Sequence, residues 1–249
     1  MINEKGFVGS FELEDISFFE KEKTINLHSF FYDYSYISDN FLSEKESEIF
    51  LSIVNDYINV PVGINGKYKD YHSEKDVVGS YRGSLYNKEL AKIFFDRIKK
   101  SYPEKRNFLE STTTDHDNFN NWKLIGVNPL FRFIKYLKDG SLIPHYDAPY
   151  IKNNRERTLV TMIIYLTDNN KGFTRFLKDS QINIPVNDKN LNDWSDYAKD
   201  EEVIKKVNPK KGRLLLFDHR ILHDSEKISY NEEKVIIRTD LIFEKNYAK

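Results

Sequence analysis

Residues 158–166, Thr-Leu-Val-Thr-Met-Ile-Ile-Tyr-Leu, are the stretch that decides the fold. β-Branched, aliphatic and aromatic side chains fill this run almost without a break, and Gly172 follows it. A short apolar run bounded by a turn residue is typical of a buried β-strand. Similar runs occupy the rest of the C-terminal half: Phe131–Leu137, Leu142–Tyr146, Thr174–Leu177, Arg213–Phe217 and Lys234–Phe243. The sequence therefore predicts a β-rich C-terminal half.

The N-terminal half carries helical patterns instead. Ser43 and Glu46 have the spacing of a capping box, and the apolar residues that follow predict a helix over about residues 43–58. Asn87 opens a second helical pattern over about 87–101, which a proline then ends. Residues 24–37 predict one or two strands, and the polar stretch 104–121 predicts a loop.

Together these elements predict a mainly β fold with helices (α+β). N-terminal helices are expected to buttress a C-terminal antiparallel barrel of the jelly-roll or cupin-like type. No linker rich in Pro, Gly or Ser separates the halves, so we expect a single domain over residues 1–249. Residues 1–126 form its support region and residues 127–245 its barrel core. The polar stretch 178–206 is interpreted as an insertion in the barrel.

The composition excludes several functional classes. Hydrophobic residues make up 39% of the 249 residues, enough for a substantial core, while a net charge of −1 argues against binding to nucleic acid or to an anionic membrane. The chain has no cysteine, so any metal must be bound by His, Asp, Glu or backbone oxygens. The first residues do not resemble a signal peptide, and no long apolar run is present. We therefore expect a cytoplasmic protein.

Two histidine-containing segments carry the candidate chemistry. His145 and Asp147 are two residues apart, so on a strand their side chains share a face about 7 Å apart. That spacing alone is equally compatible with an ordinary surface strand end. The apolar run before residue 218 leads to His219 and His223, either of which supplies a second histidine. Two histidines and one carboxylate form the facial triad of non-haem Fe(II) oxygenases. His28, His72 and His116 lack a partner at metal-ligand spacing.

The last predicted strand has an unusual charged face. Lys234, Arg238 and Asp240 alternate with apolar residues and therefore share one side of the strand. One interpretation is a half-exposed edge strand with a salt-bridged outer face. The other places the charges inside the barrel mouth, where Lys234 or Arg238 binds a carboxylate, because an unpaired buried charge is very costly.

Residues 127–243 resemble the prolyl-4-hydroxylase-like branch of the 2-oxoglutarate/Fe(II)-dependent dioxygenase superfamily. The matching segments, in order, are 128–136, 144–147, 159–166, 172–176, 215–223 and 234–240. The resemblance implies a double-stranded β-helix barrel. It also implies that iron is bound by His145, Asp147 and His223, and that the co-substrate 2-oxoglutarate is bound by Lys234, Arg238 and Tyr136.

Two departures from the family pattern concern the co-substrate site. The family's Gly-Gly-Glu-Thr is replaced by Lys171-Gly172-Phe173-Thr174, and the glycine before its lysine is replaced within Asn231-Glu232-Glu233. The tight turn at Gly172 and the 2-oxoglutarate contacts are therefore expected to differ from the family's. The iron ligands are unaffected by these changes.

The implied function is hydroxylation of a C–H bond with O₂, releasing succinate and CO₂. Asp147 favours hydroxylation or desaturation, because related halogenases have Gly or Ala at this place. The expected substrate is a small amino-acid-like molecule or a peptide, and Arg132 near the barrel mouth suits a carboxylate-bearing one. The alternative is a non-catalytic cupin-like module that binds a metal or a sugar. Such a module has no evident need for Lys234 and Arg238.

Overall fold

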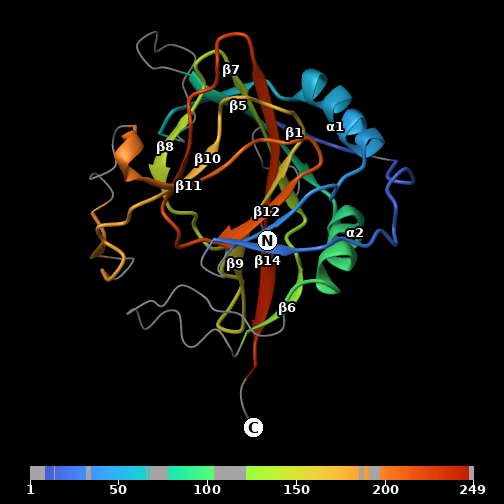
Figure 1. Ribbon diagram of the computed structural model, residues 1–249. Coiled ribbons are helices and arrows are strands. Elements are labelled where there is room, and N and C mark those ends of the chain that lie inside the picture. The colour runs from blue at the N-terminus through green and yellow to red at the C-terminus, as the bar shows by residue number, and fades with distance from the viewer. Residues whose placement is uncertain are drawn as a thin grey trace.

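Two sheets carry the C-terminal half of the chain (Figure 1). The computed structural model describes residues 9–13, 15–31, 35–65, 67, 78–103, 122–184, 188–190 and 197–246. The barrel strands are β7 (Leu130–Leu137), β8 (Leu142–His145), β9 (Glu156–Tyr165), β10 (Thr174–Leu177), β11 (Val203–Val207), β12 (Leu214–Asp218), β13 (His223–Ser225) and β14 (Glu233–Lys245).

The order of these strands identifies the fold. In the larger sheet the neighbours run β7-β14-β9-β12, and in the smaller sheet they run β11-β10-β13-β8. Every one of these pairings is antiparallel, and the chain alternates between the sheets except at β10 and β11. Strands that alternate in this way form a double-stranded β-helix. The predicted fold class is therefore confirmed.

The interior of the barrel follows from strand alternation, since successive side chains point to opposite faces. Ile134 on β7, Ile236 on β14 and Phe176 on β10 belong to one buried cluster contributed by both sheets. Lys234 and Arg238 lie on the same face of β14 as Ile236 and therefore point inward. β14 pairs with β7 on one side and β9 on the other, so it is a central strand. The interpretation as a salt-bridged edge strand is wrong.

The N-terminal helices begin where the sequence predicts. α1 (Glu44–Tyr57) has a complete capping box: the Glu46 amide donates to Ser43 Oγ over 3.2 Å, and the Ser43 amide donates to Glu46 Oε2 over 2.8 Å. α2 (Lys88–Lys99) begins after Asn87, whose Oδ1 accepts from the Leu90 amide over 2.8 Å. These contacts satisfy amides that have no partner inside a helix.

Both helices cover the outer face of the larger sheet (Figure 1). The Phe50 ring of α1 lies 5.5 Å from Phe133, and the Phe94 ring of α2 lies 5.7 Å from Phe131, measured between ring centroids. Phe131 and Phe133 are the outward-facing residues of β7. The helices therefore pack against the outer face of a barrel strand, so the inner face remains available for a site.

A buried ion pair joins the two helices. Arg97 Nη2 of α2 lies 2.5 Å from Glu46 Oε1 of α1, and both side chains are fully buried. The guanidinium also donates to the carbonyl oxygens of Phe41, over 2.8 Å, and Glu20, over 2.7 Å. Burial raises the pKa of Glu46, but the hydrogen bonds from Arg97 and Ser43 outweigh it and lower that pKa below its usual value.

Replacing Arg97 with methionine is expected to lower the free energy of unfolding by about 3–5 kcal/mol, because Glu46 is then left buried without its counter-charge. Urea unfolding followed by circular dichroism measures the change. The double variant R97M/E46Q keeps the helix cap without a buried charge, and we expect it to be more stable than R97M. A single variant within about 1 kcal/mol of the wild type would contradict this account.

Several strands have no clear signal in the sequence. In the described residues they are β1 (Ser10–Phe11), β4 (Val60–Gly63), β5 (Val78–Tyr86), β6 (Trp122–Val127) and β11. β11 occupies 203–207, so the end of the predicted insertion 178–206 belongs to the smaller sheet. β5 contains Gly79, where a side chain would meet Ser141 O at 2.5 Å. This close approach requires glycine, a residue that weakens any strand signal.

The predicted N-terminal strands are present, whereas the predicted loop falls outside the described residues. Residues 24–37 do contain strands, β2 (His28–Phe31) and β3 (Ser35–Ser38). The predicted loop 104–121 lies outside the described residues, as do His72 and His116. Neither helix among the described residues has the length and apolar character needed to span a membrane.

Candidate metal centre

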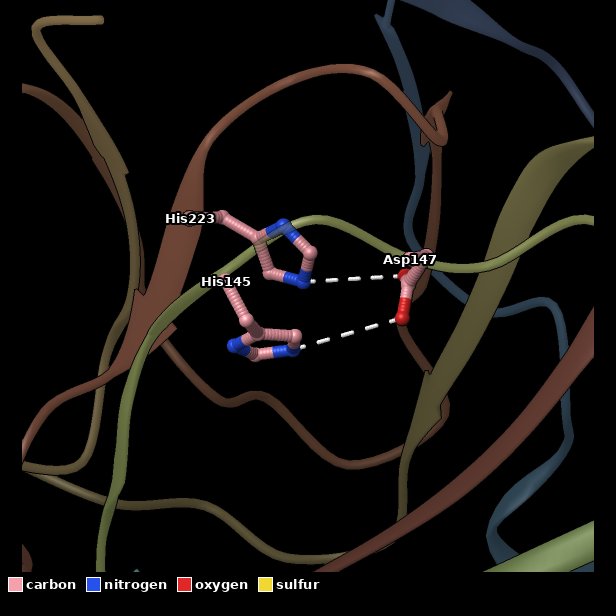
Figure 2. Close-up of side chains that lie close together, drawn as sticks. All are labelled: His145, Asp147 and His223. Carbon is pink, nitrogen blue, oxygen red and sulfur yellow. Dashed lines mark ion pairs between the residues drawn. The ribbon is translucent and has the colours of Figure 1, made fainter. Parts of the chain in front are cut away.

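His145 and His223 face each other across two paired strands. In the register of β8 and β13, His223 lies directly opposite His145. Side chains of opposite residues share a face, and the two imidazole centroids lie 4.3 Å apart (Figure 2). A histidine pair far apart in sequence is thus produced by strand register alone.

Both rings present the same nitrogen to the site. His145 Nδ1 lies 2.9 Å from Ile143 O, and His223 Nδ1 lies 2.9 Å from Ile221 O. Each Nδ1 therefore donates to a backbone carbonyl, which leaves Nε2 with a free lone pair. Burial lowers the pKa of His145 to about 4, with a further contribution from His223, and burial also lowers the pKa of His223. Neutral rings with a free Nε2 are the form that binds metals.

Asp147 completes the group just after the end of β8. Its Oδ2 lies 3.6 Å from His223 Nε2, and its Oδ1 lies 4.0 Å from His145 Nε2 (Figure 2). The potential ligand atoms of the three residues all lie within 4.8 Å of one another. Three ligands on one face of an octahedral ion are about 3 Å apart at bond lengths of about 2.1 Å. A small contraction of the group therefore fits an octahedral divalent metal bound by one face.

Two side chains hold the Asp147 carboxylate in place, and a third neighbour binds its backbone amide. The Thr161 hydroxyl of β9 donates to Oδ2, and Arg238 Nη2 of β14 lies 2.8 Å from Oδ1. The Asp147 amide donates to His219 O over 3.1 Å. Burial raises the pKa of Asp147, but the positive charge of Arg238, joined by that of the two histidines when they are protonated, lowers this pKa far below its usual value. The carboxylate is thus ionised and oriented, as a metal ligand must be.

His219 does not join this group. Its Nε2 lies 3.3 Å from Asp240 Oδ1, and the side chain is buried. Asp240 Oδ1 also forms an ion pair with Arg238, whose Nη2 lies 3.2 Å away. Of the two histidines that the sequence leaves open, the structure therefore brings His223 to the candidate metal ligands and places His219 behind them.

Lys234 lies in a separate polar cluster inside the barrel. The side chain is 1% exposed, and its Nζ donates to Gly172 O over 2.6 Å and to Ser225 Oγ over 2.8 Å. The Tyr136 ring centroid lies 4.8 Å from Nζ, and the Tyr136 hydroxyl shares a hydrogen bond with Ser225. In the described part of the chain Lys234 forms no ion pair within 4 Å, and Asp224 and Glu226 act on it only from further away. Burial lowers the pKa of Lys234 to about 7.

The distance from this cluster to the histidines suits a small dicarboxylate. Ser225, which holds Lys234 Nζ, is two residues from His223 on the same strand. Two residues of a strand span about 7 Å, close to the length of a five-carbon dicarboxylate. A ligand bound to the metal at one end can therefore place its far carboxylate on Lys234. The turn at Gly172, altered relative to the family pattern, still leaves its carbonyl oxygen facing this lysine.

Three polar residues near the site were missed by sequence reasoning. Thr161 of β9 is 14 residues from Asp147, and Ser225 of β13 is nine residues from Lys234 of β14, so only the fold reveals these contacts. Lys189 belongs to the insertion and donates to the Tyr146 hydroxyl over 3.1 Å and to Asp179 over 3.2 Å. The Lys189 ammonium also lies 4.4 Å from the centroid of the Tyr146 ring. The described part of the insertion thus contacts Tyr146, the residue between two of the candidate metal ligands, His145 and Asp147, in the sequence.

Comparison with protein families identifies the barrel. Residues 131–239 match the model of the 2OG-Fe(II) oxygenase superfamily. The matched part of the chain, which contains the barrel and the three candidate metal ligands, is assigned to this superfamily. Its members use Fe(II) and 2-oxoglutarate, so the predicted superfamily, enzyme class and cofactors of this oxygenase are confirmed. No curated protein sequence matches the oxygenase.

Solved structures with similar folds include the epimerase SnoN from nogalamycin biosynthesis, described as non-heme and alpha ketoglutarate dependent. It is 12% identical over 86% of this oxygenase and 79% of its own chain, with a TM-score of 0.50. The viral collagen prolyl hydroxylase of Paramecium Bursaria Chlorella virus-1 is 17% identical over 85% and 96%, with a TM-score of 0.45. A prolyl-4-hydroxylase of Pseudomonas putida is 12% identical over 86% and 94%, with a TM-score of 0.47. At such identities the likeness concerns the fold alone.

Proposed function

We propose that this oxygenase hydroxylates a C–H bond of a small amino-acid-like or peptidyl substrate. In the balanced reaction, substrate, O₂ and 2-oxoglutarate become hydroxylated substrate, succinate and CO₂. The observation that carries the proposal is Lys234, a buried ammonium without a carboxylate partner among the described residues. A buried ammonium without an ion pair is costly, and the attraction of Asp224 and Glu226 does not prevent burial from lowering its pKa. Its retention one strand repeat from the histidines therefore argues for an anionic ligand there.

The proposal assigns a role to each residue of the site. His145, Asp147 and His223 would bind Fe(II), and Lys234 would bind the far carboxylate of 2-oxoglutarate with Tyr136 and Ser225 beside it. Bound iron would couple decarboxylation of 2-oxoglutarate to insertion of one oxygen atom into the substrate. Arg238 would orient Asp147 rather than bind the co-substrate, because its Nη2 is already engaged by Asp147 and Asp240.

The barrel interior protects this chemistry from water. The Phe217 ring lies 4.7 Å from the His223 ring, and the Phe176 ring lies 5.3 Å from Phe217, measured between centroids. Both phenylalanines are fully buried. An apolar wall of this kind lowers the local dielectric, which strengthens the contact of Lys234 with a carboxylate.

Two measurements test the proposed function. Purified protein incubated with Fe(II), 2-oxoglutarate and O₂ is expected to form succinate, and a substrate should accelerate its formation. Under anaerobic conditions, Fe(II) and 2-oxoglutarate together should produce a visible absorption band through chelation. A folded protein that gives neither signal would instead be a non-catalytic, cupin-like module that binds a metal or a sugar.

A further inference from the structure

Three arginines share the inward face of three neighbouring strands. On β7 and β14, Arg132 lies directly opposite Arg238, and on β5 Ser84 lies directly opposite Arg132. Arg82 is two residues from Ser84, so its side chain emerges on the same face as a diagonal neighbour of Arg132. The inward direction of this face is set by Ile134 and Ile236, which belong to the interior cluster. The three guanidinium groups therefore gather beside the candidate metal ligands.

The described residues do not balance the charges of this arginine cluster. Asp147 and Asp240 are the carboxylates that act on Arg132, and Asp240 lies 3.8 Å from Arg132 Nη1. Asp147 is also a candidate metal ligand, so a bound cation takes up its charge. Burial lowers the pKa of Arg132, and the nearby charges of Arg238 and Arg82 lower it further. A bound anion would reduce the repulsion between these guanidinium groups.

Each of the three guanidinium groups also retains unused hydrogen-bonding capacity. Arg82 Nε, Arg132 Nη1 and Arg238 Nε are buried and have no hydrogen-bond partner within the described ranges. Buried N–H groups are normally satisfied, so these atoms indicate a missing partner or bound water. The Arg132 side chain is 33% exposed, which keeps it accessible to a solute entering the barrel mouth.

The co-substrate does not account for this cluster. Arg238 and Lys234 are four residues apart on β14, which is about 13 Å along a strand. A five-carbon dicarboxylate anchored on Lys234 reaches the metal ligands but does not extend beyond them to Arg132. The arginine cluster thus faces the part of the cavity that is left for the primary substrate.

We propose that Arg82, Arg132 and Arg238 form a subsite for a carboxylate of the primary substrate. The planar fork of arginine pairs with a carboxylate through two parallel hydrogen bonds, which a neutral amide does not match. The inference rests on the proposed function, since it assigns the substrate class of the same site. It narrows an amino-acid-like or peptidyl substrate to one whose carboxylate lies close to the oxidised carbon.

Matched probes test the subsite without requiring turnover. The panel consists of N-acetyl amino acids and N-acetyl dipeptides, each supplied as the free acid and as the carboxamide. Binding is read from the change in the visible absorption of anaerobic protein with Fe(II) and 2-oxoglutarate, and from the thermal midpoint of metal-free protein. At least one acid is expected to bind roughly tenfold or more tightly than its amide, the typical gain from charge-assisted hydrogen bonds.

Two near-isosteric variants assign the selectivity to the cluster. R132M is expected to remove most of the preference for acid over amide, while the half-saturating concentration of 2-oxoglutarate changes far less. R82M serves as the second variant if R132M does not fold. K135M is the matched control, because Lys135 lies on the outer face of the same strand, where it pairs with Glu233 at 3.1 Å.

The outcomes separate this inference from the proposed function. Equal binding of acids and amides across the panel would overturn the carboxylate subsite, as would equal effects of R132M and K135M. If the wild type shows no absorption band with Fe(II) and 2-oxoglutarate, the proposed function fails instead. The thermal midpoint of the metal-free protein still reports on acid selectivity in that case.

Discussion

Substituting asparagine for Asp147 is expected to lower succinate formation by more than about 100-fold. Loss of an outer partner of a metal ligand typically costs 10–100-fold in affinity or activity, and loss of the anionic ligand itself costs more. Asparagine preserves the size of the side chain and its ability to accept from Thr161, so the change isolates the negative charge. Activity is measured as succinate released at saturating Fe(II), and metal affinity by equilibrium dialysis with Fe(II).

A milder variant on the same contact serves as the comparison. R238M removes the guanidinium that lies 2.8 Å from Asp147 Oδ1 but keeps the carboxylate. Its effect on Fe(II) affinity is expected to fall within the 10–100-fold range of an outer partner. Circular dichroism controls for folding, because D147N leaves Arg238 with Asp240 as its only remaining carboxylate among the described contacts. Wild-type turnover in folded D147N would exclude Asp147 as a metal ligand.

The parts of the fold that were predictable are those with local causes. Ser43 with Glu46, and Asn87, define helix starts through contacts that span three residues, so they are visible in any short window of sequence. β9 and β14 are buried in the middle of the larger sheet, and their β-branched runs follow from that burial. Local patterning of this kind predicts an antiparallel barrel, and the resemblance to the family implies that it is a double-stranded β-helix.

The strands that were missed depend on partners far away in the sequence. β5 has the sequence Val-Gly-Ser-Tyr-Arg-Gly-Ser-Leu-Tyr, whose glycines and serines indicate a loop. It becomes a strand because β7 and β4 supply hydrogen-bond ladders on its two sides. Tertiary pairing overrides weak propensity here. The same strand brings Arg82 to the barrel mouth, so the error in secondary structure also hid a candidate substrate residue.

The site was predictable in its residue types but not in its contacts. His145 and Asp147 follow from a motif, and the resemblance to the family selects His223 over His219. The charged face of the last strand indicates Lys234 and Arg238. Their partners follow only from register, as when β9 places Thr161 beside Asp147. Register also gives Arg238 and Lys234 different neighbours, although the strand pattern alone makes them look equivalent. A one-residue shift would reverse the facing of each side chain.

Replacing Lys234 with methionine is expected to weaken 2-oxoglutarate binding by roughly 30-fold or more. Truncating one partner of a buried, hydrogen-bonded charge pair costs at least about 2 kcal/mol. Methionine preserves much of the apolar stem that packs near Gly172, where the lysine Cδ lies 3.2 Å from the position of an added Cβ. Titration of the anaerobic Fe(II) protein with 2-oxoglutarate measures the affinity. K135M again controls for loss of a lysine.

The pH dependence of the wild type distinguishes this role from a purely structural one. The pKa of Lys234 is about 7 in the folded, ligand-free protein, well below the value of about 10.4 for an unfolded lysine. The unfolded chain therefore binds more protons between these pH values, and Lys234 makes the free energy of unfolding rise with pH across that window. A dicarboxylate requires the protonated form, so its affinity should fall by up to tenfold per pH unit above pH 7.

The pH dependence of stability and that of 2-oxoglutarate affinity have opposite signs, but both arise from deprotonation of Lys234. As pH rises above 7, the wild type is expected to gain stability and lose affinity for 2-oxoglutarate, whereas K234M lacks both contributions. A lysine that only packs in the core would produce the first trend without the second. Affinity that is equally independent of pH in both proteins, at constant ionic strength, would place the far carboxylate elsewhere. The opposing trends would show that the charge of Lys234 destabilises the empty barrel and is retained for the ligand.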